Sequence, residues 1–124
     1  MFLRRDDRKA EPQLEVMVWS DNNSTPLGEL IATNITVAGG VAFDLWAGTN
    51  APAGYYVYSF MPRQKTAKLP TKGSLEVDMM QFFHLLEGRL YFSMDMYLDV
   101  VEAGFEIVRG IGWVTCGWFS CEAD

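Results

Sequence analysis

Histidine and cysteine are scarce in this sequence, which contains one His and two Cys. A His-ligated metal centre or a Ser-His-Asp triad has only His84 to draw on, and two cysteines are too few for a disulfide framework. In one extended strand, the Cα atoms of Cys116 and Cys121 would lie roughly 16 Å apart, beyond bridging distance. We therefore expect a structural His84, two free cysteines unless Gly117 folds the strand back, and any chemistry to come from carboxylates.

Basic residues and long hydrophobic runs are also scarce. Ten Lys and Arg stand against 16 Asp and Glu, a formal net charge of −6, and no basic stripe extends beyond Arg4–Lys9. We therefore expect no nucleic-acid partner. No apolar stretch approaches the roughly 20 residues that cross a bilayer, and Met1–Leu3 leads into charged residues without the apolar region of a signal peptide. The sequence predicts neither a membrane anchor nor an export signal within it.

The composition is that of a globular protein. Apolar residues make up 49 % of the chain and charged residues 21 %, with a mean hydropathy near zero, so the chain can build a hydrophobic core. A length of 124 residues leaves room for one domain at most. We find no internal repeat or linker, and we expect residues 1–124 to form a single unit.

Most of the chain alternates apolar and polar residues with the period of a β-strand. Gly39 and Gly40 separate two of these runs and predict a hairpin, because glycine reaches positive φ without strain. The predicted strands are Gln13–Trp19, Leu30–Val37, Val41–Trp46, Tyr55–Met61, Met96–Val108 and Trp113–Cys121.

One segment follows the helical period instead. Apolar residues from Leu75 to Leu86 recur at i, i+4, i+7, i+8 and i+11, which predicts an amphipathic helix over Leu75–Glu87. Ser74 is its candidate N-cap and Gly88 its stop. Short strands and a single helix indicate an all-β fold, an antiparallel sandwich or jelly roll, in preference to a βαβ fold.

Alternate side chains of a strand face opposite sides of a sheet, which divides the first predicted strand into two faces. The even-numbered positions from Leu14 to Val18 are apolar and predict a core face. The odd-numbered positions place Glu15 beside Met17 and Trp19. Glutamate is depleted in strands, and a carboxylate beside aromatic and apolar groups suits a cleft.

Carboxylates also alternate in the predicted strand Met96–Val108, at Glu102 and Glu106. Carbohydrate clefts need aromatic faces for stacking on sugar rings and two carboxylates that act on the glycosidic bond. The alternative, which the residues alone leave open, is that Glu15 and Glu106 are solubilising residues on an exposed sheet face.

Two glutamate motifs and several further segments occur in the order of a known enzyme family. The first motif is Glu15-Val16-Met17-Val18-Trp19, and the second is Ala103-Gly104-Phe105-Glu106 followed by Gly110. They resemble the E-[LIV]-M-[IV]-W and G-[TF]-E motifs of glycoside hydrolase family 12, the small jelly-roll endoglucanases and xyloglucanases. Further matches are Pro26–Gly28, Ile31–Gly48, Val57–Phe60, the helix with Phe82 and Phe83, and Tyr97-Leu98. The resemblance covers residues 12–120.

The resemblance implies retaining endo-hydrolysis of β-1,4-glucosidic bonds in cellulose-like β-glucan or xyloglucan, without a cofactor. Glu15 corresponds to the nucleophile and Glu106 to the general acid/base. Met17 and Trp19 match positions that border the substrate, although Trp19 also suits a core aromatic at a strand end. Glu102 shares the face of Glu106 by parity and is a further candidate for contact with sugar hydroxyls. We expect the two catalytic carboxyl groups about 5 to 7 Å apart on one face, with the helix on the other.

The resemblance also implies that part of the fold is missing. The family's catalytic domain is much longer, and the aspartate that supports its nucleophile would lie just upstream of Met1. Asp6 and Asp7 do not replace it, because their charged run is typical of a turn. We therefore expect an N-terminally truncated jelly roll: a fragment, a mis-assigned start or a truncated paralogue.

Two functions follow as alternatives. One is the glucanase activity itself, with the polysaccharide as substrate and a proteinaceous inhibitor as a further partner. The other is an inactive homologue that acts as a glucan-binding or inhibitor-binding decoy. The resemblance implies an extracellular location, and the N-x-[ST] sequons at Asn22, Asn23 and Asn34 are compatible with export.

Overall fold

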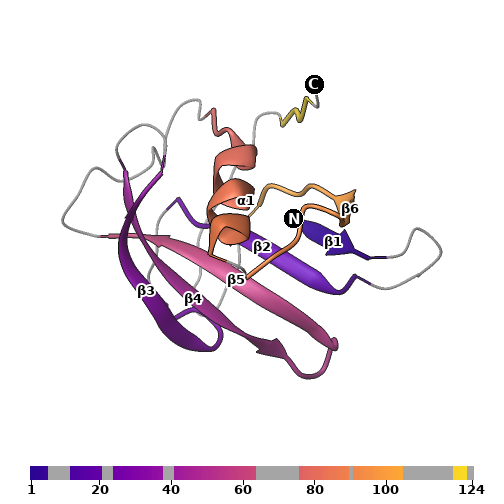
Figure 1. Cartoon of the computed structure of the whole chain (residues 1–124), viewed down its shortest axis with the longest axis horizontal. Helices are drawn as coiled ribbons and strands as arrows, with labels where there is room; N and C mark the ends of the chain where they lie inside the picture. Colours follow the sequence, from indigo (N-terminus) through magenta and orange to yellow (C-terminus); the bar gives the residue numbers. More distant parts are fainter. Residues whose placement is uncertain are drawn as a thin grey trace, which may run out of the picture.

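The structure is a computed structural model, and its described residues form a mixed β-sheet with one helix on one face (Figure 1). The described residues are 1–5, 12–20, 24–37, 41–63, 76–89, 91–104 and 119–122. The strands are β1 (Phe2–Arg4), β2 (Leu14–Val18), β3 (Glu29–Thr36), β4 (Ala42–Asn50), β5 (Tyr55–Pro62) and β6 (Tyr97–Val100), and the helix is α1 (Met79–Gly88).

The strands form one sheet in the order β3-β4-β5-β2-β1-β6. All neighbours run antiparallel except β2 and β5, which are parallel, with Glu15 opposite Val57. The sheet is therefore mixed and not antiparallel throughout as the sequence predicts, because alternation within single strands does not reveal the direction in which they pair. Thr36 lies opposite Ala42 across β3 and β4, which confirms the predicted hairpin pairing. Its Gly-Gly turn lies outside the described residues.

The core lies on one face of this sheet, because the apolar positions of neighbouring strands are in register. In β2 the burial alternates as the sequence predicts, with Leu14 and Val16 buried and Glu15 and Met17 half-buried. The central strands contribute Phe43, Leu45, Ala47, Tyr58 and Phe60 to the same buried cluster.

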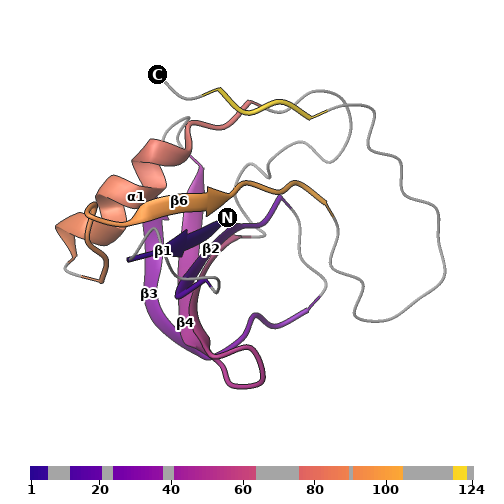
Figure 2. The same ribbon diagram turned by 90° about the vertical axis from the view of Figure 1, so that its right-hand side faces the viewer.

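Helix α1 covers this apolar face, as the two views in Figures 1 and 2 show. Phe82 contacts Phe43 edge-to-face at a centroid distance of 5.4 Å and Phe60 at 4.9 Å. Leu86 is fully buried in the same cluster. Burying each such side chain contributes roughly 1.5–3 kcal/mol. The helix therefore lies on the face opposite to Glu15, as the sequence predicts.

The predicted start of the helix is wrong. Residues 76–78 are not helical, and α1 begins at Met79 with Asp78 as its N-cap. The Asp78 carboxylate accepts a hydrogen bond from the Met80 amide at 3.0 Å, a strong capping interaction. Val77 packs against the core without being helical, so the apolar period extends beyond the helix. The predicted N-cap, Ser74, lies outside the described residues, whereas the end at Gly88 is confirmed.

Strand β1 is absent from the sequence-based prediction. It has three residues, too few to show alternation, and its position comes from pairing with both β2 and β6. Phe2 lies opposite Glu15, and Leu3 is buried in the core. The short segment therefore extends the sheet beside the candidate nucleophile.

The predicted strand Met96–Val108 is shorter than expected. Strand β6 ends at Val100, and residues 101–104 are not in a strand. Its partner β1 is only three residues long, and Gly104 weakens a strand because it has no side chain to pack. Residues 105–108 lie outside the described residues. Of the predicted strand Trp113–Cys121, residues 119–121 are not in a strand and 113–118 are not described.

Candidate active site

Three of the candidate residues meet in one pocket on the face opposite the core. Glu15, Met17 and Trp19 line a hollow of about 120 Å³. Parity along β2 directs them to this side, and the flanking strands β1 and β5 hold β2 on both edges. Trp19 continues the ladder, because its amide donates to the Phe60 carbonyl at 3.0 Å. The backbone that carries Glu15 is therefore fixed by strands on both sides.

The floor of this pocket includes Ser59, which is 1 % exposed. Ser59 lies opposite Met17 in the parallel β2–β5 pair, and its hydroxyl donates to the Met17 thioether at 3.7 Å. This contact is weak, but it ties the Met17 side chain to a buried partner.

One residue that lines the pocket has a buried donor. Among the described residues, the indole Nε1 of Trp19 is a buried nitrogen without a hydrogen-bond partner. Leaving such a group unsatisfied costs about 1–3 kcal/mol. The Trp19 side chain therefore lies in the pocket lining with its indole nitrogen shielded from solvent.

The rim of the pocket comes from two other places in the chain. Residues Ser24–Leu27, between β2 and β3, line one side. Asn50, at the end of β4, lines another side and donates to the Tyr55 hydroxyl at 3.2 Å. The ring of Tyr55 meets that of Phe2 edge-to-face at 5.5 Å. Asn50 is therefore held by its neighbours at the pocket, with β5 between its strand and β2.

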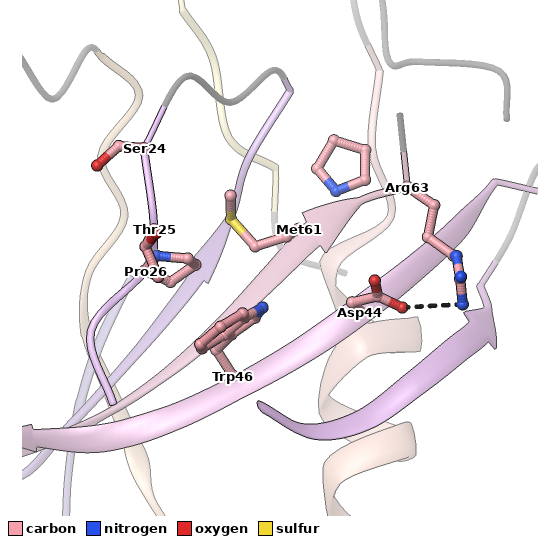
Figure 3. Close-up of a pocket in the computed structure, with 8 residues that line it drawn as sticks. Ser24, Thr25, Pro26, Asp44, Trp46, Met61 and Arg63 are labelled. Atoms are coloured by element: carbon pink, nitrogen blue, oxygen red, sulfur yellow. Dashed lines mark ion pairs between the residues drawn. The ribbon is translucent and has the colours of Figure 1, made fainter. Parts of the chain in front are cut away.

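A second pocket of about 210 Å³ opens on the same face, next to the first (Figure 3). Its lining includes Trp46 and Asp44 on β4, Met61 on β5, and Arg63 just beyond β5. The Asp44 carboxylate forms an ion pair with Arg63 at 3.3 Å. It also accepts a hydrogen bond from the backbone N–H of Asn34 at 2.9 Å. Two independent contacts therefore fix this carboxylate.

Glu15 and Glu102 both act electrostatically on the amino group of Met1, next to β1. The Met1 amino group donates to the Val16 carbonyl at 2.9 Å. Burial lowers the pKa of this amino group, whereas the negative charges of Glu15 and Glu102 act to raise it. Both carboxylates therefore act on one cationic group.

Glu102 itself does not join the pocket. It is exposed, follows the end of β6, and lines neither pocket. The parity argument does not apply to it, because residues 101–104 are not in a strand. Contact between Glu102 and sugar hydroxyls stays a prediction. Glu106 lies outside the described residues, so its predicted distance from Glu15 also stays a prediction.

Sequence reasoning missed several residues of the pocket. Val57 and Ser59 line it, and the parity of the predicted strand Tyr55–Met61 already places both on one face. Asn50 had no such signal, because the predicted strand Val41–Trp46 stops before it. The pairing of β2 with β5, which brings these residues to Glu15, links segments about 40 residues apart in sequence.

His84 and Cys121 line neither of these pockets. His84 is exposed on α1, with Nδ1 3.9 Å from the Glu87 carboxylate, and Cys121 is a free, exposed thiol. Cys116 is not among the described residues. No group of three or more His, Cys, Asp or Glu in the described ranges could hold a metal ion. None of the helices described is long and apolar enough to cross a membrane.

Comparison with known proteins gives a family at the level of sequence and a related fold at the level of structure. Residues 1–122 match the family described as glycosyl hydrolase family 12. A probable xyloglucan-specific endo-β-1,4-glucanase A of Neosartorya fischeri is 41 % identical over 101 residues, which cover 77 % of this chain and 38 % of the relative. A protein of the same description from Aspergillus fumigatus is 38 % identical over 101 residues, with the same coverage.

The fold is similar to that of a family 12 xyloglucanase from Bacillus licheniformis. The TM-score is 0.61 at 23 % identity, over 77 % of this chain and 41 % of the other. This likeness confirms the predicted fold class, a jelly-roll-type β-structure with one short helix. The chain spans about 40 % of the length of these proteins. The match over residues 1–122 shows that this chain belongs to glycosyl hydrolase family 12.

Proposed function

We propose that this chain hydrolyses internal β-1,4-glucosidic bonds of xyloglucan or a cellulose-like β-glucan, with retention of anomeric configuration. The observation that carries the proposal is the single pocket shared by Glu15, Met17 and Trp19 on the face opposite the core. Both fungal relatives are described as probable xyloglucan-specific endoglucanases, which favours xyloglucan as the substrate.

In the proposed mechanism, the ionised Glu15 carboxylate attacks the anomeric carbon of the bound sugar. The new carbon–oxygen bond forms as the glycosidic bond breaks, and Glu106 gives its proton to the departing sugar oxygen. Glu106 then takes a proton from water, which attacks the anomeric carbon and releases Glu15. The proposed role of Glu15 rests on its sequence motif and on its position in the pocket. The proposed role of Glu106 rests on its sequence motif alone.

The residues around Glu15 support sugar binding. The rings of Trp19 and the thioether of Met17 provide apolar contact on the same side as the carboxylate. Asn50 at the rim offers a side-chain amide to sugar hydroxyls. None of these steps uses a cofactor.

We also propose that the protein works outside the cell, where its polysaccharide substrates and proteinaceous inhibitors occur. The family resemblance supports this location. Asn34, in the sequon Asn34-Ile35-Thr36, is exposed and therefore accessible to a glycan. The test is expression in a eukaryotic secretory host. A mass increase that N-glycosidase removes, and that Asn34→Gln does not show, would support export and glycosylation.

The test of the activity is reducing-sugar release from xyloglucan and from barley β-glucan. We expect Glu15→Gln and Glu106→Gln each to lower the rate by more than about 10³-fold. Glu87→Gln, on the opposite face in α1, serves as the matched control and keeps the rate. Glucan binding without hydrolysis would favour the decoy function instead. A folded protein that neither binds nor cleaves either glucan would contradict the proposal.

A further inference from the structure

We propose that Tyr55 is a positioning residue for sugar binding at the pocket of Glu15, because its hydroxyl fixes the side-chain amide of Asn50. The inference rests on the proposed function, since it concerns the same ligand and the same pocket. Asn50 lines that pocket, whereas Tyr55 does not. Tyr55 therefore acts through Asn50 and not by contact with the sugar.

The backbone of Asn50 is fixed by a short hairpin. Asn50 is the last residue of β4 and lies opposite Tyr55, the first residue of β5. The Asn50 carbonyl accepts hydrogen bonds from the Ala53 amide at 3.1 Å and from the Gly54 amide at 2.7 Å. Gly54 has a φ of +81°, which glycine adopts without strain. The hairpin therefore gives Asn50 a defined place at the rim of the pocket.

The side chain of Asn50 is fixed by Tyr55. Its Nδ2 donates a hydrogen bond to the Tyr55 hydroxyl at 3.2 Å. The carboxamide group is planar, and the torsion that turns it is otherwise broad. A hydrogen bond at the nitrogen therefore also fixes the direction of Oδ1, on the other side of the plane's axis. That oxygen is an acceptor suited to a sugar hydroxyl.

Tyr55 is itself held by an aromatic contact across β2. Tyr55 on β5 and Phe2 on β1 belong to the strands that flank β2, and their rings meet edge-to-face at 5.5 Å. Phe2 and Val57 both lie opposite Glu15, and Tyr55 shares the face of Val57 by parity. The two rings therefore meet on the face that carries Glu15. This contact limits the movement of the Tyr55 hydroxyl, since such ring pairs prefer a particular geometry.

The contacts from Phe2 through Tyr55 to Asn50 order a polar group before any ligand binds. A pre-ordered group loses less conformational entropy when it binds a sugar. Removing the Tyr55 hydroxyl takes this advantage away and leaves the carboxylate of Glu15 in place. Ground state and transition state then lose the same binding interaction, a change that raises KM and leaves kcat unaltered.

The test is the kinetics of glucan hydrolysis by Tyr55→Phe, which removes the hydroxyl and keeps the ring. We expect KM to rise about two- to tenfold while kcat stays within about twofold. A merely structural role would lower the folded fraction, and thus kcat, at constant KM. Asn50→Ala should raise KM at least as much, and Tyr55→Phe should add nothing in that background. Tyr56→Phe, which removes the neighbouring hydroxyl from the opposite face, is the matched control and should change neither constant.

Thermal unfolding of each variant separates a loss of binding from a loss of folding. If the chain binds glucan without cleaving it, dissociation constants from calorimetric titration replace KM, with the same expected factors. An unchanged constant in folded Tyr55→Phe or in folded Asn50→Ala would overturn the inference and leave the proposed function intact. A folded parent that neither binds nor cleaves glucan would overturn both.

Discussion

Gly28 lies against Gly48, backbone to backbone. A Cβ built on Gly48 would lie 2.6 Å from the Gly28 Cα, and one built on Gly28 would lie 2.0 Å from the Ala47 carbonyl oxygen. Gly28 also has a φ of +90°, which other residues rarely adopt. This contact fixes the segment Ser24–Leu27, which lines the pocket of Glu15, against strand β4.

Replacing Gly48 with Ala should therefore disturb both stability and ligand binding. The added methyl group meets backbone atoms that cannot rotate away, and such overpacking costs about 1–3 kcal/mol. We expect a lower melting temperature and weaker binding of glucan oligosaccharides. Gly88→Ala, at the end of α1, is the matched control, because a Cβ there meets nothing within 4 Å. Equal melting temperatures for the two variants would contradict this role of the contact.

The packing of α1 on the sheet predicts a large effect for Phe82→Ala. Phe82 is 3 % exposed and contacts both Phe43 and Phe60. Removing its ring leaves a cavity, and Phe→Ala changes of this kind cost about 3–5 kcal/mol. Met80→Ala, on the exposed side of the same helix, should change the free energy of unfolding far less. Denaturant unfolding measures both, and similar midpoints would argue against helix packing as a main source of stability.

Tyr58 predicts a specific alkaline instability. Its hydroxyl donates to the Tyr91 carbonyl at 2.7 Å, and burial, followed by the nearby Tyr56 and Tyr91, raises its pKa to about 12. The unfolded phenol titrates near 10. Between these values the unfolded state binds fewer protons than the folded state. The stability that the Tyr58 phenol contributes is therefore fully present below pH 10 and falls as the pH rises toward 12.

The test is the pH dependence of the unfolding free energy in Tyr58→Phe. The variant loses one hydrogen bond, which costs about 0.5–1.5 kcal/mol at neutral pH, but it also loses the titrating group. We expect its stability to fall less steeply than that of the parent between pH 10 and 12. Tyr97→Phe, at an exposed ring, controls for general alkaline effects. Parallel pH profiles for Tyr58→Phe and the parent would refute the assignment.

Much of the fold follows from local pattern in the sequence. The alternation in Leu14–Val18 gives both the core face and the Glu15 face correctly, because a strand has only two faces. The limits come from contacts between distant segments. The parallel pairing of Leu14–Val18 with Tyr56–Phe60 and the short strand Phe2–Arg4 have no local signal, since partners elsewhere in the sheet determine both.

The site was predictable to the extent that it lies on one strand. Glu15, Met17 and Trp19 share a face by parity alone, and the structure brings them into one pocket. Ser59 and Asn50 reach that pocket only through strand pairing. The prediction for Glu102 assumed a strand that ends earlier, at Val100, so strand alternation does not specify its direction.

The central claim is that Glu15 is the nucleophile of a retaining glucanase, and trapping of the covalent intermediate tests it most directly. The protein is incubated with a 2-deoxy-2-fluoro cello-oligosaccharide that carries a good leaving group, and its peptides are analysed by mass spectrometry. The account predicts one glycosyl group on the peptide that contains Glu15, and no label in Glu15→Gln. Label on a different residue, or hydrolysis of glucan by a protein that the reagent does not label, would contradict it.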